Sequence, residues 1–570
     1  MYILGLSSYA HESSCALIKN GEIKSIIEEE RLNREKHTWK LPKLSIKKCL
    51  EMENISINDI DYFTFFWQPK KEISGNLSHF MRYFPATLNT LTTSSGGSEM
   101  NAIQRISAMK KIGKTLQEEF NLSNAPHIEF VEHHLAHVAS SFFVSPFEKS
   151  AILILDGRGE SISTSMYHGE KNNITKISET KVPHSLGHFY AAVTDYLGFK
   201  PFFDEWKVMG MSAYGKNNYV EEFSELVELL PNGQFRLNLK YFNFHTHGSG
   251  KWVSDYFIKK FGEKRNPNSE YHQKHFDVAF GLQRTIEKIG VHIANFLYDK
   301  TKLSNLCLAG GVALNVLMNR EIIKKTPFKN LFIQPIAHDA GTSFGSALYF
   351  YNYEMKKARN FQFKHTYWGP EYTNKEIEKI LVESNLTYHK SNNIAKETAQ
   401  QIADEKIIGW FQGRMEAGPR ALGNRSITVS PLKADMKDRL NERVKRREYF
   451  RPFAPSVLEE RVSDFFEMPK NINSPYMILS GEVKEEKRQI IPAVTHADNT
   501  ARVHTVNSKD NLKYWSLIHE FEKITGVPVL LNTSFNENEP IVCTPKDAVE
   551  CFLRTDFDIL SIGDFLISKS

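Results

Sequence analysis

Three histidines fall within five positions in EHHLAHVASS, residues 132–141, and PHSLGHFYAA carries a second pair with the same spacing. The chain thus has two His-x3-His pairs, His133/His137 and His184/His188, where about one is expected by chance from 21 histidines in 570 residues. Histidines at positions i and i+4 share one face of a helix, so both imidazoles reach one ion. Spacing alone leaves two interpretations of residues 132–141 open, a metal site and the solvated start of a helix.

A basic segment is the second candidate for chemistry. Residues 413–452 hold eleven Lys or Arg against five Asp or Glu, a local net charge of +6, whereas the whole chain carries +5. Several of these arginines stand beside Gly or Pro in GPRALGNR and FRPF, where a loop can hold a guanidinium rigidly. Guanidinium groups bind phosphate or carboxylate oxygens in bidentate geometry. The segment favours a phosphorylated small molecule, with a solvated basic face and an RNA patch as alternatives.

The elements that must position these residues include an internal repeat. Residues 2–23, YILGLSSYAHESSCALIKNGEI, predict a strand, a loop, a strand, a tight turn and a strand, because Asn20-Gly21 is typical of a hairpin turn with positive φ. Residues 151–174, AILILDGRGESISTSMYHGEKNNI, repeat this pattern about 145 residues later, which indicates an internally duplicated domain. Two unrelated β-meanders are the alternative.

The rest of the chain continues as an α/β pattern. Helices are predicted over 44–53, 99–121 and 272–299, and strand–turn–helix units with glycine-containing turns over 305–319 and 333–350. Such turns present free N–H groups and a positive dipole end to phosphate. Basic and aromatic residues with Gly369-Pro370 mark a domain boundary over 355–372. Beyond it, strands are predicted in IIGWF and GVPVLL, and helices over 436–448 and 545–555.

Composition bounds the class of protein. The chain is 41% hydrophobic and 24% charged, as in an ordinary soluble globular protein, and is long enough for two or more domains. Its start lacks a signal peptide's basic and apolar regions, and no apolar run approaches the roughly 20 residues that span a bilayer. Five cysteines without a CxxC pair argue against disulfides and zinc ribbons. We expect a cytoplasmic protein with no membrane and no nucleic-acid partner.

Seven motifs in order carry a resemblance that covers nearly the whole chain. The segments DEWKVMGMSAYG, LAGGVALN, HDAGTSFGSA, GRMEAGPRALGNRSI, FRPFAPSVL, TARVHTV and LLNTSFN together resemble the ATP-dependent O-carbamoyltransferases, which include the nodulation-factor, cephem and aminoglycoside-antibiotic enzymes. The resemblance implies an α/β protein with a duplicated actin/sugar-kinase-like ATPase fold, similar to the tRNA threonylcarbamoyl-transferring protein, over 1–355. It also implies a linker over 356–372 and a YrdC-like α/β domain over 373–570.

The resemblance also bears on the histidine pairs. It implies a metal, usually described as iron, on His133, His137, Asp156 and Asp339. A mixed N/O donor set without thiolates suits Fe²⁺, Mn²⁺ or Zn²⁺ and leaves positions for water or substrate. His134 is the alternative ligand. We interpret His184 and His188, which flank Gly187, as part of a nucleotide-contacting loop.

The reaction implied by the resemblance has two steps. Carbamoyl phosphate and ATP, with Mg²⁺, give carbamoyl-adenylate in the C-terminal domain, and a hydroxyl of a small-molecule acceptor then attacks the carbamoyl carbon in the N-terminal domain. His11 matches the general base, since a neutral imidazole suits deprotonation of an alcohol, and Lys36 matches a lysine near the acceptor. The implied adenylate-binding residues are Gly157, Gly310, Gly311 and Asn315. The implied residues for carbamoyl phosphate and ATP are Arg420, Arg425, Lys445, Arg447, Arg451, Arg502 and Ser534.

One motif departs from the family, and several points stay open. The family commonly reads HDAS where this chain reads HESS, so Glu12 adds a methylene and the role of that carboxylate is open. tRNA threonylcarbamoylation and a non-catalytic metal- or RNA-binding protein are the alternative functions; hydrogenase-maturation carbamoyltransferases are set aside because the chain has no CxxC pair. The acceptor is open among sugars, aromatic polyketides and guanidinium natural products, and the oligomeric state between monomer and homodimer.

Overall fold

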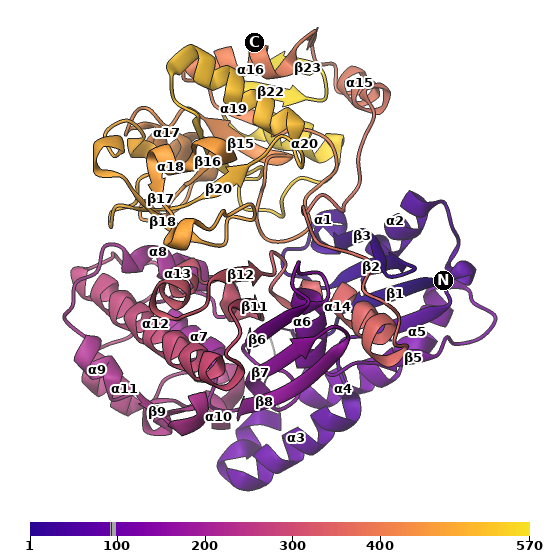
Figure 1. Cartoon of the computed structure of the whole chain (residues 1–570), viewed down its shortest axis with the longest axis vertical. Helices are drawn as coiled ribbons and strands as arrows, with labels where there is room; N and C mark the ends of the chain where they lie inside the picture. The colour runs from indigo at the N-terminus through magenta and orange to yellow at the C-terminus, as the bar shows by residue number, and fades with distance from the viewer. Residues whose placement is uncertain (92, 94–97, 570) are drawn as a thin grey trace. The chain divides into compact units, whose positions relative to one another are not determined.

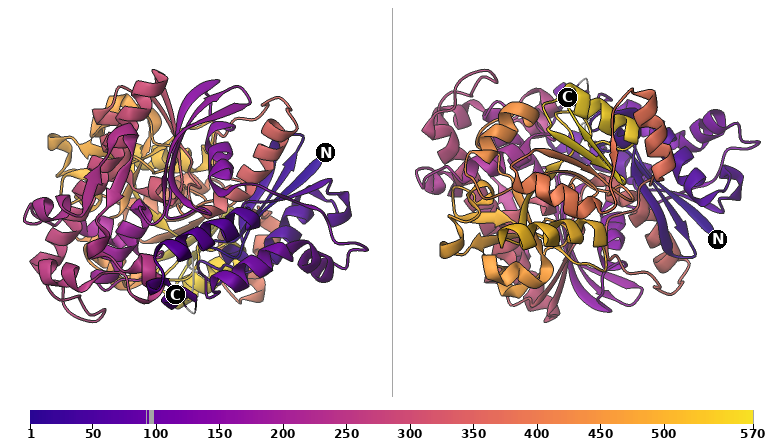
Figure 2. Two further views of the ribbon diagram at one scale, coloured as in Figure 1. Left: turned by 90° about the horizontal axis from the view of Figure 1, so that it is seen from below. Right: turned by 90° about the horizontal axis from the view of Figure 1, so that it is seen from above.

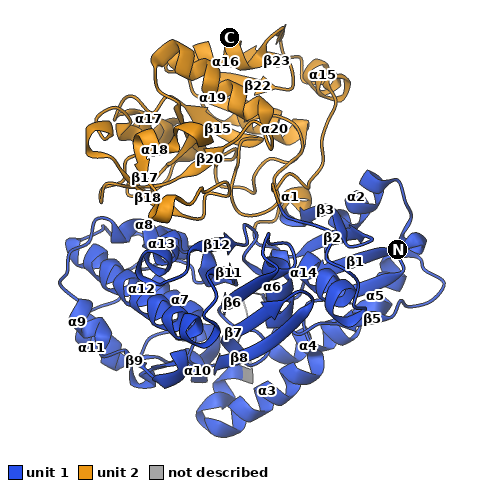
Figure 3. Ribbon diagram, viewed as in Figure 1, with its two compact units in different colours: residues 1–30, 37–363 blue, residues 31–36, 364–570 orange. Residues whose placement is uncertain are grey.

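The chain divides into two compact units. The computed structural model describes residues 1–91, 93 and 98–569. Unit 1 comprises Met1–Glu30 and His37–Phe363, and unit 2 comprises Arg31–Lys36 and Lys364–Ser570 (Figure 3). The main boundary lies at 363/364, within the predicted linker 356–372, whereas the short segment Arg31–Lys36 groups with unit 2. In the described ranges, no helix is long and apolar enough to cross a membrane.

The first half of unit 1 contains a five-stranded mixed sheet of order β3-β2-β1-β4-β5 (Figures 1 and 2). Strands β1, β2 and β3 form an antiparallel meander, and β4 and β5 continue the sheet in parallel with β1. The turn residues Asn20 and Gly21 have φ of 52° and 84°, as the hairpin prediction requires. The strands are β1 (Tyr2–Ser7), β2 (Ser14–Lys19), β3 (Glu22–Glu28), β4 (Tyr62–Phe65) and β5 (Ile128–Phe130). The helices are α2 (Lys43–Glu53), α3 (Pro69–Arg82), α4 (Ala102–Lys110), α5 (Ile112–Phe120) and α6 (His133–Phe142).

The second half of unit 1 repeats this topology. Its sheet has the order β12-β11-β6-β7-β8, with β6, β7 and β8 antiparallel and with β11 and β12 parallel to β6. The strands are β6 (Lys149–Leu155), β7 (Ile162–Glu170), β8 (Asn173–Lys181), β11 (Asn305–Ala309) and β12 (Asn330–Ile333), with a separate hairpin of β9 (Val227–Leu229) and β10 (Phe235–Leu237). The helices are α7 (Leu186–Tyr196), α8 (Glu205–Ser212), α9 (Val220–Ser224), α10 (Phe244–His247), α11 (Asp255–Phe261), α12 (Gln273–Thr301), α13 (Val316–Lys325) and α14 (Thr342–Leu348). The matching strand orders confirm the predicted internal duplication.

Close packing of small residues brings the two halves of unit 1 together through α6 and α14. A Cβ atom on Gly345 would lie 2.1 Å from the carbonyl oxygen of Ala136, so only glycine allows this approach. Both helices are almost fully buried, and their serines donate to backbone carbonyls one turn earlier in the chain; Ser140 Oγ, for example, donates to the His137 oxygen at 2.9 Å. Since α6 carries both histidines of the first pair, this packing fixes their position.

Unit 2 is a second α/β domain, as the sequence pattern beyond residue 372 predicted. Its eight-stranded mixed sheet has the order β13-β23-β22-β14-β15-β21-β16-β20, and a three-stranded sheet has the order β17-β18-β19. Its core forms around Trp410, Tyr514 and Phe521, where α16 and α19 pack against each other. The strands are β13 (His389–Lys390), β14 (Ile408–Phe411), β15 (Arg425–Val429), β16 (Ala454–Leu458), β17 (Phe466–Glu467), β18 (Ser480–Val483), β19 (Thr500–Arg502), β20 (His504–Val506), β21 (Val529–Ser534), β22 (Ile559–Ile562) and β23 (Phe565–Ser568). The helices are α15 (Asn374–Glu383), α16 (Ile394–Ala403), α17 (Met436–Leu440), α18 (Val462–Phe465), α19 (Leu512–Thr525) and α20 (Pro545–Arg554), and α1 (Glu30–Asn33) lies mostly in the Arg31–Lys36 segment.

Two predicted helices differ from the structure. The helix predicted over 436–448 is regular only in α17; residues Asn441–Lys445 form a π-helical turn, and Arg446 ends it with φ of 42°. The helical region predicted over 99–121 is divided into α4 and α5 by Lys111. In the first case the π turn and the positive φ interrupt the 3.6-residue period that the sequence pattern assumed, and π turns are frequent at functional sites.

Candidate metal centre and anion-binding site

Four side chains from three segments of unit 1 meet in the structure. His133 and His137 are the first and fifth residues of α6, Asp156 follows β6, and Asp339 starts a short 3₁₀ turn before α14. The Nε2 atoms of the two histidines lie 3.2 Å apart, and Asp156 Oδ2 lies 3.2 Å from His133 Nε2. Asp339 Oδ1 lies 3.6 Å from His133 Nε2 and 3.8 Å from His137 Nε2. The structure thus brings together all four residues predicted to hold a metal.

The spacing of these atoms fits a common ion. Ligands about 2.1 Å from one ion stand about 3.0 Å apart at neighbouring octahedral positions and about 3.4 Å apart in a tetrahedron. The observed separations of 3.2 to 3.8 Å are close to these values. Two imidazoles with two carboxylates form a donor set that iron, manganese and zinc all accept. The residues present therefore fit a divalent transition metal.

The carboxylates set the charge state of this cluster. Burial disfavours a charged imidazole, but Asp339 and Asp156 outweigh it and raise the pKa of His133 to about 9. Burial dominates at His137 and lowers the pKa of that imidazole. The Asp156 carboxyl is buried too, yet the adjacent His133 and His137 hold its pKa well below the usual value. The Asp156 carboxylate thus stays ionised although it is buried, as a metal ligand must.

His134 and the second pair, His184 and His188, lie outside this group. His134 Nδ1 lies 2.6 Å from Ser165 Oγ, and burial lowers the pKa of this imidazole well below its usual value. His184 Nδ1 accepts the N–H of Leu237 at 3.1 Å, and His188 lies in the first turn of α7, where its N–H donates to Ser185 Oγ. Among the described residues, none of these three imidazoles belongs to a group with metal-ligand spacing.

The glycines predicted to line an adenylate site surround Asp156. The Gly311 N–H donates to Asp156 Oδ1 at 3.0 Å, and Gly310 has φ of 90°, where a Cβ would lie 2.3 Å from the Leu155 oxygen. A Cβ on Gly157 would meet nothing within 4 Å, so this glycine faces open space. Asn315 caps α13 and exchanges two hydrogen bonds with Gln283, so both ends of the Asn315 side-chain amide already have a partner.

His11, the predicted base, lies in the loop after β1, in unit 1. Its ring packs 5.5 Å from the rings of His37 and Phe203, centroid to centroid, and its side chain is 18% exposed. Burial lowers the pKa of His11, and this effect exceeds the opposing effect of Glu12. The imidazole is therefore neutral at pH 7, the form that a general base needs.

A group of cations with few counter-charges lies in unit 2. Arg420 and Arg502 have no hydrogen-bond or ion-pair partner in the part of the chain that the structure describes, and their Nε atoms are buried. Burial, together with Arg420 and Arg447, holds the pKa of Arg502 well below its usual value. Arg447 packs its guanidinium 4.2 Å from the ring centroid of Phe453, and Arg451 pairs with Glu448 at 3.0 Å. Burial and like charges together destabilise this arrangement unless an anion binds.

Lys445 completes the group. Its ammonium is buried and donates to the Ser534 and Asn536 carbonyl oxygens at 2.8 and 2.7 Å and to Asn536 Oδ1 at 2.7 Å. Burial, and then Arg447 and Arg451, lower the pKa of Lys445 well below its usual value. Ser534 Oγ in turn donates to Asn536 Oδ1. Six of the seven predicted phosphate-binding residues thus belong to one neighbourhood of unit 2.

Comparisons with known proteins decide the family. Residues 2–348 match the family described as Carbamoyltransferase N-terminus, and residues 399–569 match Carbamoyltransferase C-terminus. The chain belongs to the carbamoyltransferase family.

Relatives of this carbamoyltransferase include named nodulation proteins. Over 570 aligned residues it is 38% identical to nodulation protein NolNO of Sinorhizobium fredii, covering 99% of this chain and 80% of the relative. It is 40% identical to nodulation protein NolO of Bradyrhizobium diazoefficiens, over 77% of this chain and 79% of the relative. An uncharacterised protein of Synechocystis, sll1178, is 38% identical over 100% of this chain and 97% of the relative. Component A of Acidaminococcus fermentans (R)-2-hydroxyglutaryl-CoA dehydratase resembles it distantly, with 13% identity, a TM-score of 0.33, and coverage of 62% of this chain and 98% of that one.

Two residues that the motifs predicted for binding and catalysis, Arg425 and Lys36, donate hydrogen bonds to backbone oxygens in the structure. Arg425 is fully buried; its guanidinium donates to the Gln412, Gly413 and Asn424 oxygens and lies 3.6 Å from the Phe411 ring centroid. These bonds hold the loop together, and its Nε is buried without a hydrogen-bond partner among the described residues. Lys36, predicted to lie near the acceptor, belongs to unit 2, where its ammonium donates to the Asn538 oxygen at 3.4 Å.

Residues that the motifs did not single out also shape the site. Glu160 Oε1 accepts the N–H groups of His133 at 3.1 Å and Gln68 at 2.9 Å, which fixes the start of α6, and burial raises the pKa of Glu160 to about 7. His338 pairs with Glu12, and His37 Nδ1 lies 2.9 Å from Glu12 Oε1. The available signal was weak: His338 precedes Asp339 in HDAG, and His37 follows Lys36 in REKHT.

Proposed function

We propose that this carbamoyltransferase is an ATP-dependent O-carbamoyltransferase acting on a hydroxyl of a small-molecule acceptor. Unit 2 forms carbamoyl-adenylate from carbamoyl phosphate and ATP, and unit 1 transfers the carbamoyl group. The observation that carries the proposal is the group of Arg420, Arg447 and Arg502 in unit 2, whose guanidiniums form no ion pair among the described residues. Substrates with several phosphate groups supply the missing negative charge.

The first reaction, the formation of carbamoyl-adenylate, uses the residues of unit 2. Water cleaves carbamoyl phosphate to carbamate and phosphate, and a carbamate oxygen then attacks the α-phosphorus of ATP, releasing pyrophosphate and leaving carbamoyl-adenylate. Both parts transfer groups between highly charged species. The guanidiniums of Arg420, Arg447 and Arg502 hold phosphate oxygens and offset their mutual repulsion, while Lys445 fixes the Ser534–Asn536 turn beside them.

The second reaction uses the residues of unit 1. The acceptor hydroxyl attacks the carbamoyl carbon, the bond to the adenylate oxygen breaks, and AMP leaves. Neutral His11 accepts the hydroxyl proton, and the open face at Gly157 leaves room for the adenylate. His133, His137, Asp156 and Asp339 would hold the metal, which supplies Lewis-acid polarisation of an oxygen when bound.

The structure weighs against the RNA-binding alternative. Most of the basic residues between 413 and 452 do not form a free basic face: Lys433 and Arg439 pair with Glu405, and Arg443 pairs with Asp558. Arg446 pairs with Glu537, and Arg414 and Arg425 donate to backbone carbonyl oxygens. Four further cations of this segment belong to the phosphate-binding group described above: Arg420, Lys445, Arg447 and Arg451. Binding of RNA that falls steeply with salt, without turnover of carbamoyl phosphate, would favour that alternative.

The decisive experiment separates the two reactions. Purified protein is incubated with ATP and carbamoyl phosphate, and pyrophosphate release and carbamoyl-adenylate are followed by mass spectrometry. We expect Arg502→Ala to abolish adenylate formation and His137→Ala to retain it. Arg461→Ala is the matched control, because Arg461 pairs with Asp464 and Glu522 on the surface of unit 2. Absence of adenylate with the unsubstituted protein would refute the proposal.

A further inference from the structure

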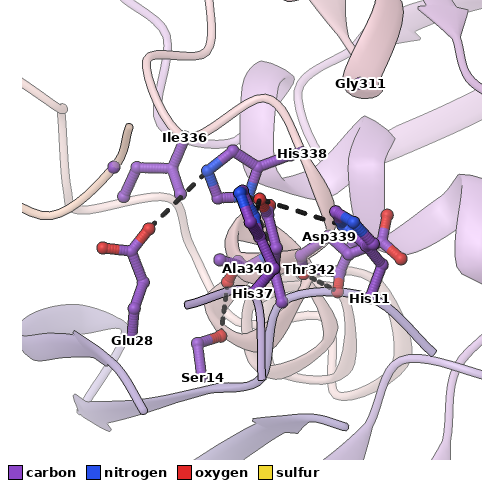
Figure 4. Close-up of polar contacts among 12 residues, drawn as sticks. His11, Ser14, Glu28, His37, Gly311, Ile336, His338, Asp339, Ala340 and Thr342 are labelled. Atoms are coloured by element: carbon purple, nitrogen blue, oxygen red, sulfur yellow. Dashed lines mark hydrogen bonds and ion pairs between the residues drawn. The ribbon is translucent and has the colours of Figure 1, made fainter. Parts of the chain in front are cut away.

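A second group of nitrogen and oxygen donors lies in unit 1. His11 and Glu12 come from the loop between β1 and β2, and His37 is the residue at which the chain returns to unit 1. One donor atom of each lies within 4.8 Å of the other two. Figure 4 shows His11 and His37 close together, with His338 beside them. None of these residues belongs to the four-ligand group of His133, His137, Asp156 and Asp339.

Glu12 Oε1 stands between the two imidazoles. It lies 2.9 Å from His37 Nδ1 and 3.8 Å from His11 Nδ1. Two imidazoles and one carboxylate form a facial set that binds divalent transition metals and leaves open positions. The separations are those of ligands around one ion after small side-chain rotations, since ligands on opposite sides of an ion stand about 4.2 Å apart.

Charged neighbours orient the Glu12 carboxylate in the way that residues around a metal site orient its ligands. The second oxygen of Glu12, Oε2, pairs with His338 Nδ1. His338 Nε2 in turn lies 3.6 Å from Glu28 Oε1 (Figure 4). Such outer ion pairs orient a ligating carboxylate and leave its other oxygen for the metal. His11 Nε2 is buried without a hydrogen-bond partner among the described residues. Glu12 and His37 both have φ of 55°, a strained conformation that persists where the surrounding structure imposes it.

We propose that His11, Glu12 and His37 bind a second divalent transition-metal ion, such as Zn²⁺ or Co²⁺. The ion uses one ring nitrogen of each histidine and Glu12 Oε1. The consequence for catalysis rests on the proposed function: an ion on His11 engages the lone pair of the base. Excess zinc should therefore inhibit carbamoyl transfer while pyrophosphate release in unit 2 continues.

Zinc stoichiometry tests the site without reference to activity. The full chain is stripped with a chelator, saturated with Zn²⁺, desalted, and its zinc content measured per chain. In a His137→Ala, Asp156→Asn background, which removes the four-ligand group, we expect one zinc to remain. Adding Glu12→Gln should remove it. With Co²⁺ in the same background, a d–d absorption band should appear and should be lost with Glu12→Gln.

Controls separate loss of the site from loss of the fold. His37→Gln, at a partly exposed loop residue, should remove the same zinc if Glu12→Gln does not fold, and circular dichroism melting reports the fold of each variant. His184→Gln, outside both groups, should keep it. A background protein that binds no zinc, or that keeps its zinc after a folded Glu12→Gln or His37→Gln substitution, would overturn the second site. Zinc inhibition that persists unchanged in His37→Gln would overturn its catalytic consequence.

Discussion

Two arginines five positions apart in GPRALGNR have opposite surroundings. Arg425 is fully buried and its guanidinium is surrounded by carbonyl oxygens, whereas Arg420 is partly exposed and, among the described residues, has no such acceptors. A buried guanidinium already bonded to carbonyls supports the fold, and a guanidinium without acceptors is available for a ligand.

We therefore expect Arg425→Lys and Arg420→Lys to have different effects. Arg425→Lys leaves buried carbonyls without donors and should lower the free energy of unfolding by about 2–4 kcal/mol. Arg420→Lys should leave the melting temperature nearly unchanged and weaken phosphate binding at least tenfold, as measured by isothermal titration with pyrophosphate. Equal loss of stability in the two variants would show that both arginines are structural.

A buried histidine in unit 2, His504, should make the stability of the fold depend on pH. Burial lowers the pKa of His504 to about 3, and its Nδ1 lies 2.8 Å from Ser456 Oγ. In the unfolded chain a histidine titrates near about 6.5. The unfolded state therefore binds the extra proton first, so the stability present above pH 6.5 is lost as the pH falls towards 3.

The slope of this loss is about 1.4 kcal/mol per pH unit for one histidine. We expect His504→Asn to flatten the pH dependence by that amount between pH 6 and 4.5. Hydrogen exchange of α19 peptides at several pH values measures the local unfolding free energy. His389→Asn, which removes an exposed histidine, is the comparison. An unchanged slope in His504→Asn would mean that the imidazole is charged when folded.

At the scale of elements, turns after strands fix the candidate metal centre. Gly310 follows β11, and its φ of 90° places the Gly311 N–H on Asp156 Oδ1. We expect Gly310→Ala to destabilise the protein by about 2 kcal/mol or more, because the new Cβ meets the Leu155 oxygen and the backbone is strained. Gly157→Ala should leave the melting temperature unchanged, since its Cβ meets nothing, and should weaken adenylate binding. If Gly157→Ala melts like Gly310→Ala, that turn has no open face.

The elements show how far sequence reasoning reaches. The repeated strand–loop–strand–turn–strand pattern predicted both meanders of unit 1, because period-two apolar residues and Asn20-Gly21 act locally. Histidine spacing placed His133 and His137 on one helix face. Joining them to Asp156 and Asp339 needed either a family resemblance or the fold, because these carboxylates come from segments far along the chain. The π turn at Asn441–Lys445 and the roles of Glu160 and His338 depend on packing that no local pattern encodes.

At the scale of the whole molecule, one short segment belongs to a different unit from the residues on either side of it in the sequence. Arg31–Lys36 lies between β3 and α2 of unit 1 but groups with unit 2. Arg31 donates to the Gly418 oxygen at 2.8 Å, and Arg34 donates to the Pro540 and Ile541 oxygens. Nothing in the residues ERLNREKHT predicted this, since the contacts join positions 387 to 507 residues apart.

These contacts predict a remote effect on the phosphate-binding group. Arg34 holds the Pro540–Ile541 backbone, a few residues after Asn536, which fixes Lys445. Arg34→Ala removes the donor for both carbonyls, so the 536–541 loop should open more often and pyrophosphate binding should weaken by about threefold to tenfold, as for a loss near 1 kcal/mol. Hydrogen exchange should accelerate in peptides over 530–545 and stay unchanged over 133–156. Arg236→Ala, whose exposed side chain pairs with Glu228 in unit 1, should change neither. Unchanged exchange over 530–545 in Arg34→Ala would show that the Arg31–Lys36 segment does not stabilise this loop. The segment would then have no influence on the phosphate-binding group.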